Sequence, residues 1–473
     1  MKLLLFLFTF CIFSHAKEGL IKFHPNKVHS LFYFLDSVSG NPNTSKTLKQ
    51  NFYQSEFYSD KAKKELEEFQ EIIRILPSFS FRGFPDSRHV GANVRELLVT
   101  QSIFSLDIED FSKRTLGMLP QEKHSRLIEL MTRYEAVYDA HLWSKTKDKL
   151  EKYLKKFKSS FDIEKSNEAY KKIIKFYGSA WPESTQFHVG VYPINCKRGH
   201  TVAESLGSVE TIGVCIDSNA YKEQWGVTFH EMCHSIYQNQ PADFQKKMET
   251  VFLESKSKYA AFAYNYLNEV LATAIGNGWF PKLLTGKLDK TNWYNNKYID
   301  SMAKAMFPEI DNYLSKSRTL DQPLLEKYIS IFGKKFPESI YEFENIFSSI
   351  MVFADLSKHN KEEFRKSLNS NFRIRSWNFY DDTSLSEIKR RMNDSVGDSF
   401  IFLLGDKSMR STQELVKSIP LLNKNRDKLF NHNGHFVDVD SDGRAYIVLN
   451  ENALGNYLNL MQMFKKNKLV FKK

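Results

Sequence analysis

The sequence has no hydrophobic run that is long enough to cross a lipid bilayer. A membrane-spanning helix needs about 20 consecutive apolar residues, whereas the apolar run near the start ends at Phe13 and no later segment reaches that length. We therefore expect no transmembrane segment. The 473 residues are enough for two or three domains that each have a hydrophobic core.

The first residues have the pattern of a secretory signal. A basic residue precedes the apolar run, and Ser14-His15-Ala16 supplies the small residues that signal peptidase requires. We predict a signal peptide at residues 1–16 and a secreted or periplasmic mature protein. Lipoprotein processing at Cys11 is the alternative, but the large Phe10 before it fits that processing poorly.

Cysteine is scarce. The sequence has four, and Cys11 leaves with the predicted signal, so the remaining three cannot all form pairs. Cys196 and Cys215 end two neighbouring predicted strands. A disulfide between them is compatible with the sequence but is not decided by it. Cys233 is interpreted as a small buried residue rather than a metal ligand.

Positive charge exceeds negative charge, and the net charge is +11. The lysines are spread along the chain, with a dense run at residues 145–158. Some runs of this kind bind nucleic acid, but a solvated helix face is the simpler interpretation for an exported chain. We expect no nucleic-acid partner, and the oligomeric state stays open.

The predicted fold class is α+β, predominantly helical, in three regions after the signal. Residues 17–179 are expected to form a helical region with an irregular start at residues 17–47, because apolar residues then recur at helical spacing. Residues 180–370 are expected to form a zincin-like catalytic domain with a small strand region ahead of its main helix. Residues 371–473 are expected to form a small α/β domain.

Strand patterns occur in two places. Residues 186–192 and 209–216 are β-branched and predict two neighbouring strands, and the second strand is our candidate for an edge strand that holds an extended peptide. An ordinary core hairpin is the alternative. Residues 324–353 are predicted to be helical, and residues 436–449 a second hairpin. Its segment 438–443 opens like a calcium loop, but an Asp-Gly turn is preferred because a leucine holds the twelfth position.

The motif that organises the chain is His-Glu-x-x-His at residues 230–234. Residues i and i+4 lie on one face of a helix, so His230 and His234 can direct two imidazoles at one metal ion. Imidazole suits zinc, and Glu231 then lies where it can take a proton from the attacking water. The bare motif also occurs by chance, but its small or apolar flanks at residues 225–237 are typical of a buried helix.

A catalytic zinc site needs a third protein ligand. The metzincin arrangement would require histidine and glycine where Gln240 and Tyr237 stand. Glu254 and Glu269 are therefore the candidates. Glu269 is favoured because its neighbours predict a buried helix that closes near Gly276, and because an inserted loop changes spacing at little cost.

The segment Tyr266-Leu267-Asn268-Glu269-Val270-Leu271-Ala272 resembles the stretch that carries the third zinc ligand in the gluzincin metallopeptidases, which include thermolysin and the zinc aminopeptidases. The resemblance covers only this segment and the motif helix, and it implies that Glu269 completes the site. Spacing is the discrepancy, because Glu254 has the thermolysin interval whereas Glu269 lies 35 residues beyond His234. The absence of a Gly-x-Met-Glu-Asn segment ahead of the motif disfavours an aminopeptidase.

These features predict a zinc metallopeptidase, with an endopeptidase favoured, that hydrolyses peptide or protein substrates by direct attack of water. His230, His234 and Glu269 would bind Zn²⁺, and Glu231 would act as general base and then acid. A zinc hydrolase of non-peptide bonds and a zinc-binding envelope scaffold without peptidase activity are the alternatives. A tyrosine is expected to stabilise the oxyanion, and the candidates are Tyr294, Tyr298 and Tyr328.

Overall fold

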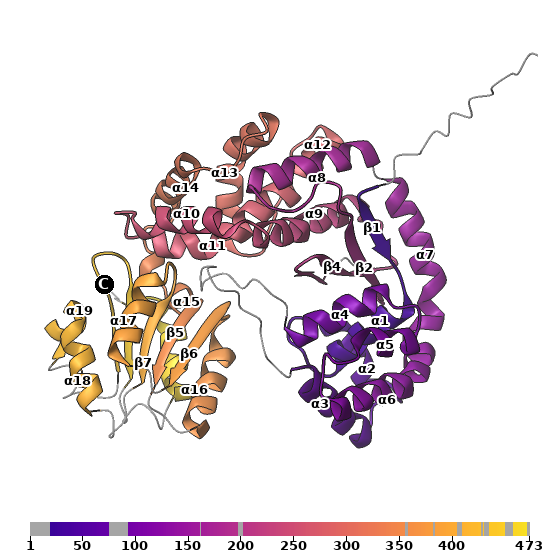
Figure 1. The fold of residues 1–473 in the computed structure, drawn as a ribbon, viewed down its shortest axis with the longest axis horizontal. Coiled ribbons are helices and arrows are strands. Elements are labelled where there is room, and N and C mark those ends of the chain that lie inside the picture. Colours follow the sequence, from indigo (N-terminus) through magenta and orange to yellow (C-terminus); the bar gives the residue numbers. More distant parts are fainter. Residues whose placement is uncertain are drawn as a thin grey trace, which may run out of the picture. The chain divides into compact units, whose positions relative to one another are not determined.

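The computed structural model describes residues 19–74, 93–160, 162–196, 202–354, 358–381, 384–403, 409–426, 429, 435–449 and 457–470. The predicted signal peptide lies outside this part of the chain. The described residues form an α+β fold that is mostly helical, as predicted, and that contains two small mixed sheets (Figure 1). None of the described helices is both long and apolar enough to cross a membrane.

The chain divides into two compact units. The first falls within Met1–Ile75, Arg95–Lys172 and Pro182–Lys222, and the second within Leu76–Val94, Ile173–Trp181 and Glu223–Lys473. This division differs from the predicted boundary near residue 180. The strands that follow that residue belong to the N-terminal unit, because an N-terminal strand pairs with the first of them, and the others join the same sheet.

The sheet of the first unit has the strand order β1-β2-β4-β3. Strand β2 (Phe187–Ile194) is parallel to both β1 (Ile21–His24) and β4 (Val209–Cys215), and β3 (Val202–Leu206) is antiparallel to β4. Strands β2 and β4 are neighbours, as predicted, but they run parallel, so the alternative of a core hairpin between them is wrong. Strand β4 is paired on both sides, so the expectation that it accepts a peptide along its edge is wrong too.

Residues 17–47 were expected to be irregular, and this expectation is also wrong. They contain β1 and the helix α1 (Lys27–Val38), in which every residue from Val28 to Val38 is buried. A helix that is buried all round has no polar face. Its sequence therefore lacks the one-sided apolar spacing from which helices are predicted.

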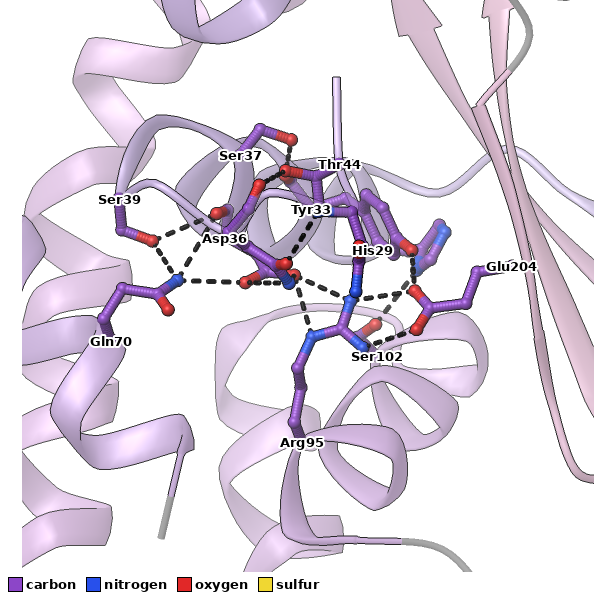
Figure 2. A network of polar contacts seen from close by, with 12 residues as sticks. His29, Tyr33, Asp36, Ser37, Ser39, Thr44, Gln70, Arg95, Ser102 and Glu204 are labelled. Atoms are coloured by element: carbon purple, nitrogen blue, oxygen red, sulfur yellow. Dashed lines mark hydrogen bonds and ion pairs between the residues drawn. The ribbon is translucent and has the colours of Figure 1, made fainter. Parts of the chain in front are cut away.

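A buried polar network ties α1 to two other elements of the first unit (Figure 2). Arg95, on α4 (Val94–Phe104), donates from Nη1 and Nη2 to the two carboxylate oxygens of Glu204 on β3, at 2.7 and 2.9 Å. Its Nε donates to Asp36 Oδ2 on α1 at 2.9 Å. Loss of either carboxylate would leave part of this buried charge uncompensated, which is strongly destabilising.

His29 on α1 is expected to make the first unit sensitive to acid. It is fully buried, its Nδ1 lies 3.0 Å from Ser102 Oγ, and its Nε2 has no hydrogen-bond partner among the described residues. Burial, assisted by the nearby His24, lowers the pKa of His29 to about 3. In the unfolded chain this histidine titrates near pH 6.5. Between about pH 3 and pH 6.5 the unfolded chain therefore binds more protons at this residue than the folded chain does.

The free energy of unfolding should therefore be highest above about pH 6.5 and should fall as the pH drops toward 3. The fall between pH 7 and pH 5 that comes from His29 alone should be on the order of 2 kcal/mol. Urea unfolding of the whole protein at both pH values measures this. A His29→Gln variant cannot titrate here and should lose that part of the pH dependence. An unchanged dependence in the variant would contradict the assignment to His29.

The other helices predicted for the N-terminal region are confirmed. The lysine run at residues 145–158 lies on α7 (Ser144–Ser159), where every lysine is exposed while the apolar side chains are buried. This is the solvated helix face that the sequence predicted. The remaining helical elements of this region are α2 (Lys46–Tyr53), α3 (Asp60–Ile73), α5 (Ile108–Thr115), α6 (Gln121–Tyr138), η1 (Asp139–Trp143) and α8 (Ile163–Tyr177).

Two long helical segments of the second unit carry the candidate metal ligands. Helix α9 (Tyr221–Gln238) contains the motif and ends before Pro241. Helix α11 (Ala260–Ala272) does not close near Gly276 as predicted, because it continues into the π-helix η2 (Thr273–Trp279) and α12. The other helical elements before the C-terminal sheet are α10 (Ala242–Leu253), α12 (Phe280–Thr285), α13 (Lys297–Ser315), α14 (Gln322–Lys335), η3 (Ser339–Tyr341) and α15 (Phe343–Ile346).

The C-terminal part is built on a five-stranded sheet in the order β6-β5-β7-β9-β8, in which only β8 is antiparallel to its neighbour. Strand β5 (Ser349–Ala354) was predicted to be the end of a helix. That prediction is wrong because all six of its residues are buried, and a short apolar run fits a buried strand as well as a helix.

Helices flank this sheet, which agrees with the predicted α/β arrangement (Figure 1). The predicted hairpin of β8 and β9 is confirmed, and the oxygen Asp440 Oδ1 accepts from the backbone N–H groups of Asp442 and Arg444 in its turn. The elements are β6 (Ser376–Asp381), β7 (Ser399–Leu403), β8 (His435–Val439), β9 (Ala445–Leu449), α16 (Lys358–Asn371), α17 (Leu385–Asp394), α18 (Met409–Ser418), α19 (Pro420–Lys424) and α22 (Tyr457–Asn467).

Candidate metal centre

Three predicted ligands come together in the second unit, two from α9 and one from α11. His230 Nε2 lies 3.1 Å from His234 Nε2, and oxygens of Glu269 lie 3.5 Å from His230 Nε2 and 3.8 Å from His234 Nε2. In a tetrahedral site with bonds of about 2.1 Å, neighbouring ligand atoms are about 3.4 Å apart. In the described part of the chain, no other group of three His, Cys, Asp or Glu residues could hold a metal ion.

Two asparagines orient the imidazoles. His230 Nδ1 lies 3.1 Å from Asn277 Oδ1, and His234 Nδ1 lies 3.0 Å from Asn268 Oδ1. An amide oxygen only accepts hydrogen bonds, so each Nδ1 donates its proton and each Nε2 presents a lone pair. Two lone pairs that face each other at this distance repel, and a shared cation removes the repulsion.

The carboxylate of Glu269 also fits a cation. Its Oε2 is buried and has no hydrogen-bond partner among the described residues. Burial acts to raise the pKa of Glu269, and positive charge at His234 and His230 acts to lower it. A buried ionised oxygen that lacks a hydrogen-bond donor is costly unless a positive charge lies beside it. The residues present therefore fit a divalent metal ion.

The π-helix η2 brings Asn277 to His230 because two glycines let the helices approach closely. A Cβ added at Gly276 would lie 2.5 Å from His230 N, and one added at Gly226 would lie 3.1 Å from Gly276 O. No side chain other than hydrogen fits between the backbones at Gly276. π-turns are frequent at functional sites, and this one supplies a partner for a candidate ligand.

We expect Asn277→Ala to weaken zinc binding by roughly 10- to 100-fold, because loss of a group that orients a metal-binding histidine typically has this effect. Competition with a chromophoric chelator measures the affinity. Asn292→Ala is the control, since Asn292 is an exposed asparagine outside the site. Equal affinities in the two variants would show that Asn277 does not orient His230 in the metal-bound state.

Glu231 follows the first ligand directly on α9 and is half-buried, whereas Glu254 lies apart from the site. Glu254 is the exposed C-cap residue of α10 and is not among the residues that come together. Of the two candidates for the third ligand, the structure thus places Glu269 with the histidines. The thermolysin-like interval was the weaker guide, because α10 occupies the intervening sequence.

Of the three candidate tyrosines, Tyr294 lies beside the site. Its ring stacks 5.9 Å from the ring of His230, measured between centroids, and burial together with the charge of Glu269 raises the pKa of its hydroxyl. The hydroxyls of the other two are engaged elsewhere. Tyr298 accepts from Asn345 at 3.0 Å, and Tyr328 donates to a backbone carbonyl at 2.9 Å.

Some residues of this region were not predicted from the sequence. Asn268 stands next to Glu269 in the segment that resembles the gluzincins, so its position was a usable signal. Asn277 gave no signal, because a π-turn cannot be read from apolar spacing. Outside the site, Cys196 and Cys215 form a disulfide with a Cα–Cα distance of 5.3 Å, and Cys233 is buried.

No protein-family model, curated protein or solved structure matches this chain.

Proposed function

We propose that this protein is an exported zinc metallopeptidase that hydrolyses peptide bonds by direct attack of water. The observation that carries the proposal is the convergence of His230, His234 and Glu269 around one point, with both imidazoles held by asparagine oxygens. Two neutral imidazoles and one carboxylate form the ligand set of known zinc peptidase sites. Zinc is favoured over harder cations because nitrogen donors predominate.

The chain supplies the remaining chemistry through two residues. Zinc, when bound, would polarise the peptide carbonyl and make water acidic enough to react near neutral pH. Glu231 would take a proton from the attacking water and pass it to the leaving amine. The hydroxyl of Tyr294, which is kept protonated by its raised pKa, would donate a hydrogen bond to the oxygen of the carbonyl as negative charge develops there.

Export is part of the proposal and has its own test. The basic start, the short apolar run and Ser14-His15-Ala16 support cleavage after Ala16. N-terminal sequencing of the protein from a secreting host should begin at Lys17. An intact Met1 in material recovered outside the cytoplasm would contradict the predicted cleavage.

The proposed activity is tested by metal analysis and peptide digestion together. Purified protein should contain zinc and should cleave members of a general peptide library. A chelator should abolish cleavage, and added zinc should restore it. A folded His230→Ala variant should lack both zinc and activity. Zinc without cleavage of any peptide would instead favour a zinc-binding scaffold, and absence of bound metal would remove the proposal.

A further inference from the structure

A cavity of about 200 Å³ lies next to the candidate metal centre within the second unit. Its lining includes Tyr237 at the end of α9, Asn268 on α11 and Arg375 immediately before β6. Asn268 is the residue whose Oδ1 faces His234 Nδ1. The cavity and the metal centre thus share a residue, so a chain bound at the metal has this cavity as its neighbouring space.

Arg375 is a positively charged side chain that lines this cavity, and it has no carboxylate partner among the described residues. Its Nη1 donates to the backbone oxygen of Asn265 at 2.9 Å, and its guanidinium lies 4.5 Å above the ring of Tyr266. These two contacts fix the position of the guanidinium. The side chain is nevertheless exposed, so its other N–H groups are accessible to a ligand.

The other charged groups of the cavity already have polar partners. Arg391 pairs with Glu387 at 2.7 Å, and Asp394 pairs with Arg390 at 2.8 Å. Asp398 is half-buried, serine hydroxyls donate to both of its oxygens at 2.6 and 2.9 Å, and burial raises its pKa. Arg375 therefore supplies the positive charge that is left for a ligand.

The distance from Arg375 to the metal centre suits a peptide. Its backbone anchor Asn265 precedes Glu269 by four residues on α11, which corresponds to about 6 Å along the helix axis. An extended chain rises about 3.3 Å per residue. A group one or two residues from the cleaved bond therefore reaches the guanidinium.

We propose that Arg375 binds a carboxylate of the peptide substrate, one or two residues from the bond that is cleaved. This inference rests on the proposed peptidase function and names its substrate class. A guanidinium presents parallel N–H donors that match the two oxygens of a carboxylate. The carboxylate belongs either to the C-terminus of the peptide or to an Asp or Glu side chain, and both present the same two oxygens.

Two pairs of peptides that contain a cleaved sequence test the inference. One pair differs only in a free or amidated C-terminus, and the other only in Glu or Gln near the cleaved bond. The wild-type protein should prefer the carboxylate member of one pair by roughly 10- to 100-fold in kcat/KM, since hydrogen bonds to charged groups are among the strong ones. The pair that shows the preference identifies the source of the carboxylate.

In Arg375→Gln the ratio between the two members should fall toward one, and in Arg375→Lys it should be intermediate. Arg318→Gln is the matched control, because Arg318 is an exposed arginine that pairs with Asp321 away from the cavity. Calorimetric binding of the same peptides to the zinc-loaded Glu231→Gln protein should give the same order of preference. This second readout does not need turnover.

The outcomes separate the two proposals. Cleavage of peptides without preference in either pair overturns the inference and leaves the peptidase function standing. A preference that survives in Arg375→Gln overturns the role of Arg375. If the wild-type protein cleaves no peptide, the peptidase function fails and this inference fails with it.

Discussion

Glu231→Gln should lower peptide hydrolysis by about 10²- to 10⁴-fold, the contribution expected of a positioned general base. Glutamine has nearly the shape of glutamate but cannot accept the proton of the attacking water. The candidate ligands His230, His234 and Glu269 are untouched, so the zinc content should stay at the wild-type level. Rates of peptide cleavage and metal analysis of the same preparation measure both quantities.

The control for this variant is Glu223→Gln, which removes the same charge from an exposed position on the same helix. It should keep wild-type rates and zinc content. Hydrolysis that persists in Glu231→Gln would remove Glu231 from its role. Joint loss of zinc and hydrolysis would mean that Glu231 helps to hold the metal instead.

The second large effect is expected from Glu269→Gln, which should reduce zinc affinity by more than the roughly 10- to 100-fold that follows loss of an outer partner. The neutral amide removes the negative charge of the candidate ligand set and leaves two neutral imidazoles. Loss of hydrolysis should follow loss of the metal. Zinc titration against a chelator and peptide cleavage at saturating zinc measure the two effects.

Glu254→Gln is the matched control because Glu254 is the competing candidate and is exposed at the end of α10. It should bind zinc as the wild-type protein does. If zinc affinity fell in Glu254→Gln and not in Glu269→Gln, the ligand assignment would have to be reversed. A fall in neither variant would leave the two histidines without the proposed third ligand.

The sequence predicted those parts of the fold that have one-sided apolar patterns. Helices α6 and α7 have a polar face in water, and their apolar residues therefore recur at helical spacing. Helix α1 and strand β5 are buried on all sides, so their sequences carry no such pattern, and both were predicted wrongly. Strands β2 and β4 were predicted as neighbours, but their parallel direction and their pairing with β1 and β3 were not, because pairing between distant segments depends on contacts that local patterns do not encode.

The candidate site was predicted better than the fold around it. His230 and His234 are one helical turn apart, so their convergence follows from helix geometry alone. The choice of Glu269 over Glu254 depended on the composition of its segment, and the structure places Glu269 with the histidines. Asn277 was missed, since it reaches His230 through tertiary packing.

Helix α10 separates the motif helix from the segment that carries Glu269, and this has a consequence for recognising related chains. The number of residues between His234 and Glu269 depends on the length of the intervening element, whereas the candidate ligands themselves come from α9 and α11. A pattern with a fixed interval would therefore pass over any chain with such an insertion. A search for two helices that place the doublet Asn268-Glu269 beside a pair of imidazoles would retain it.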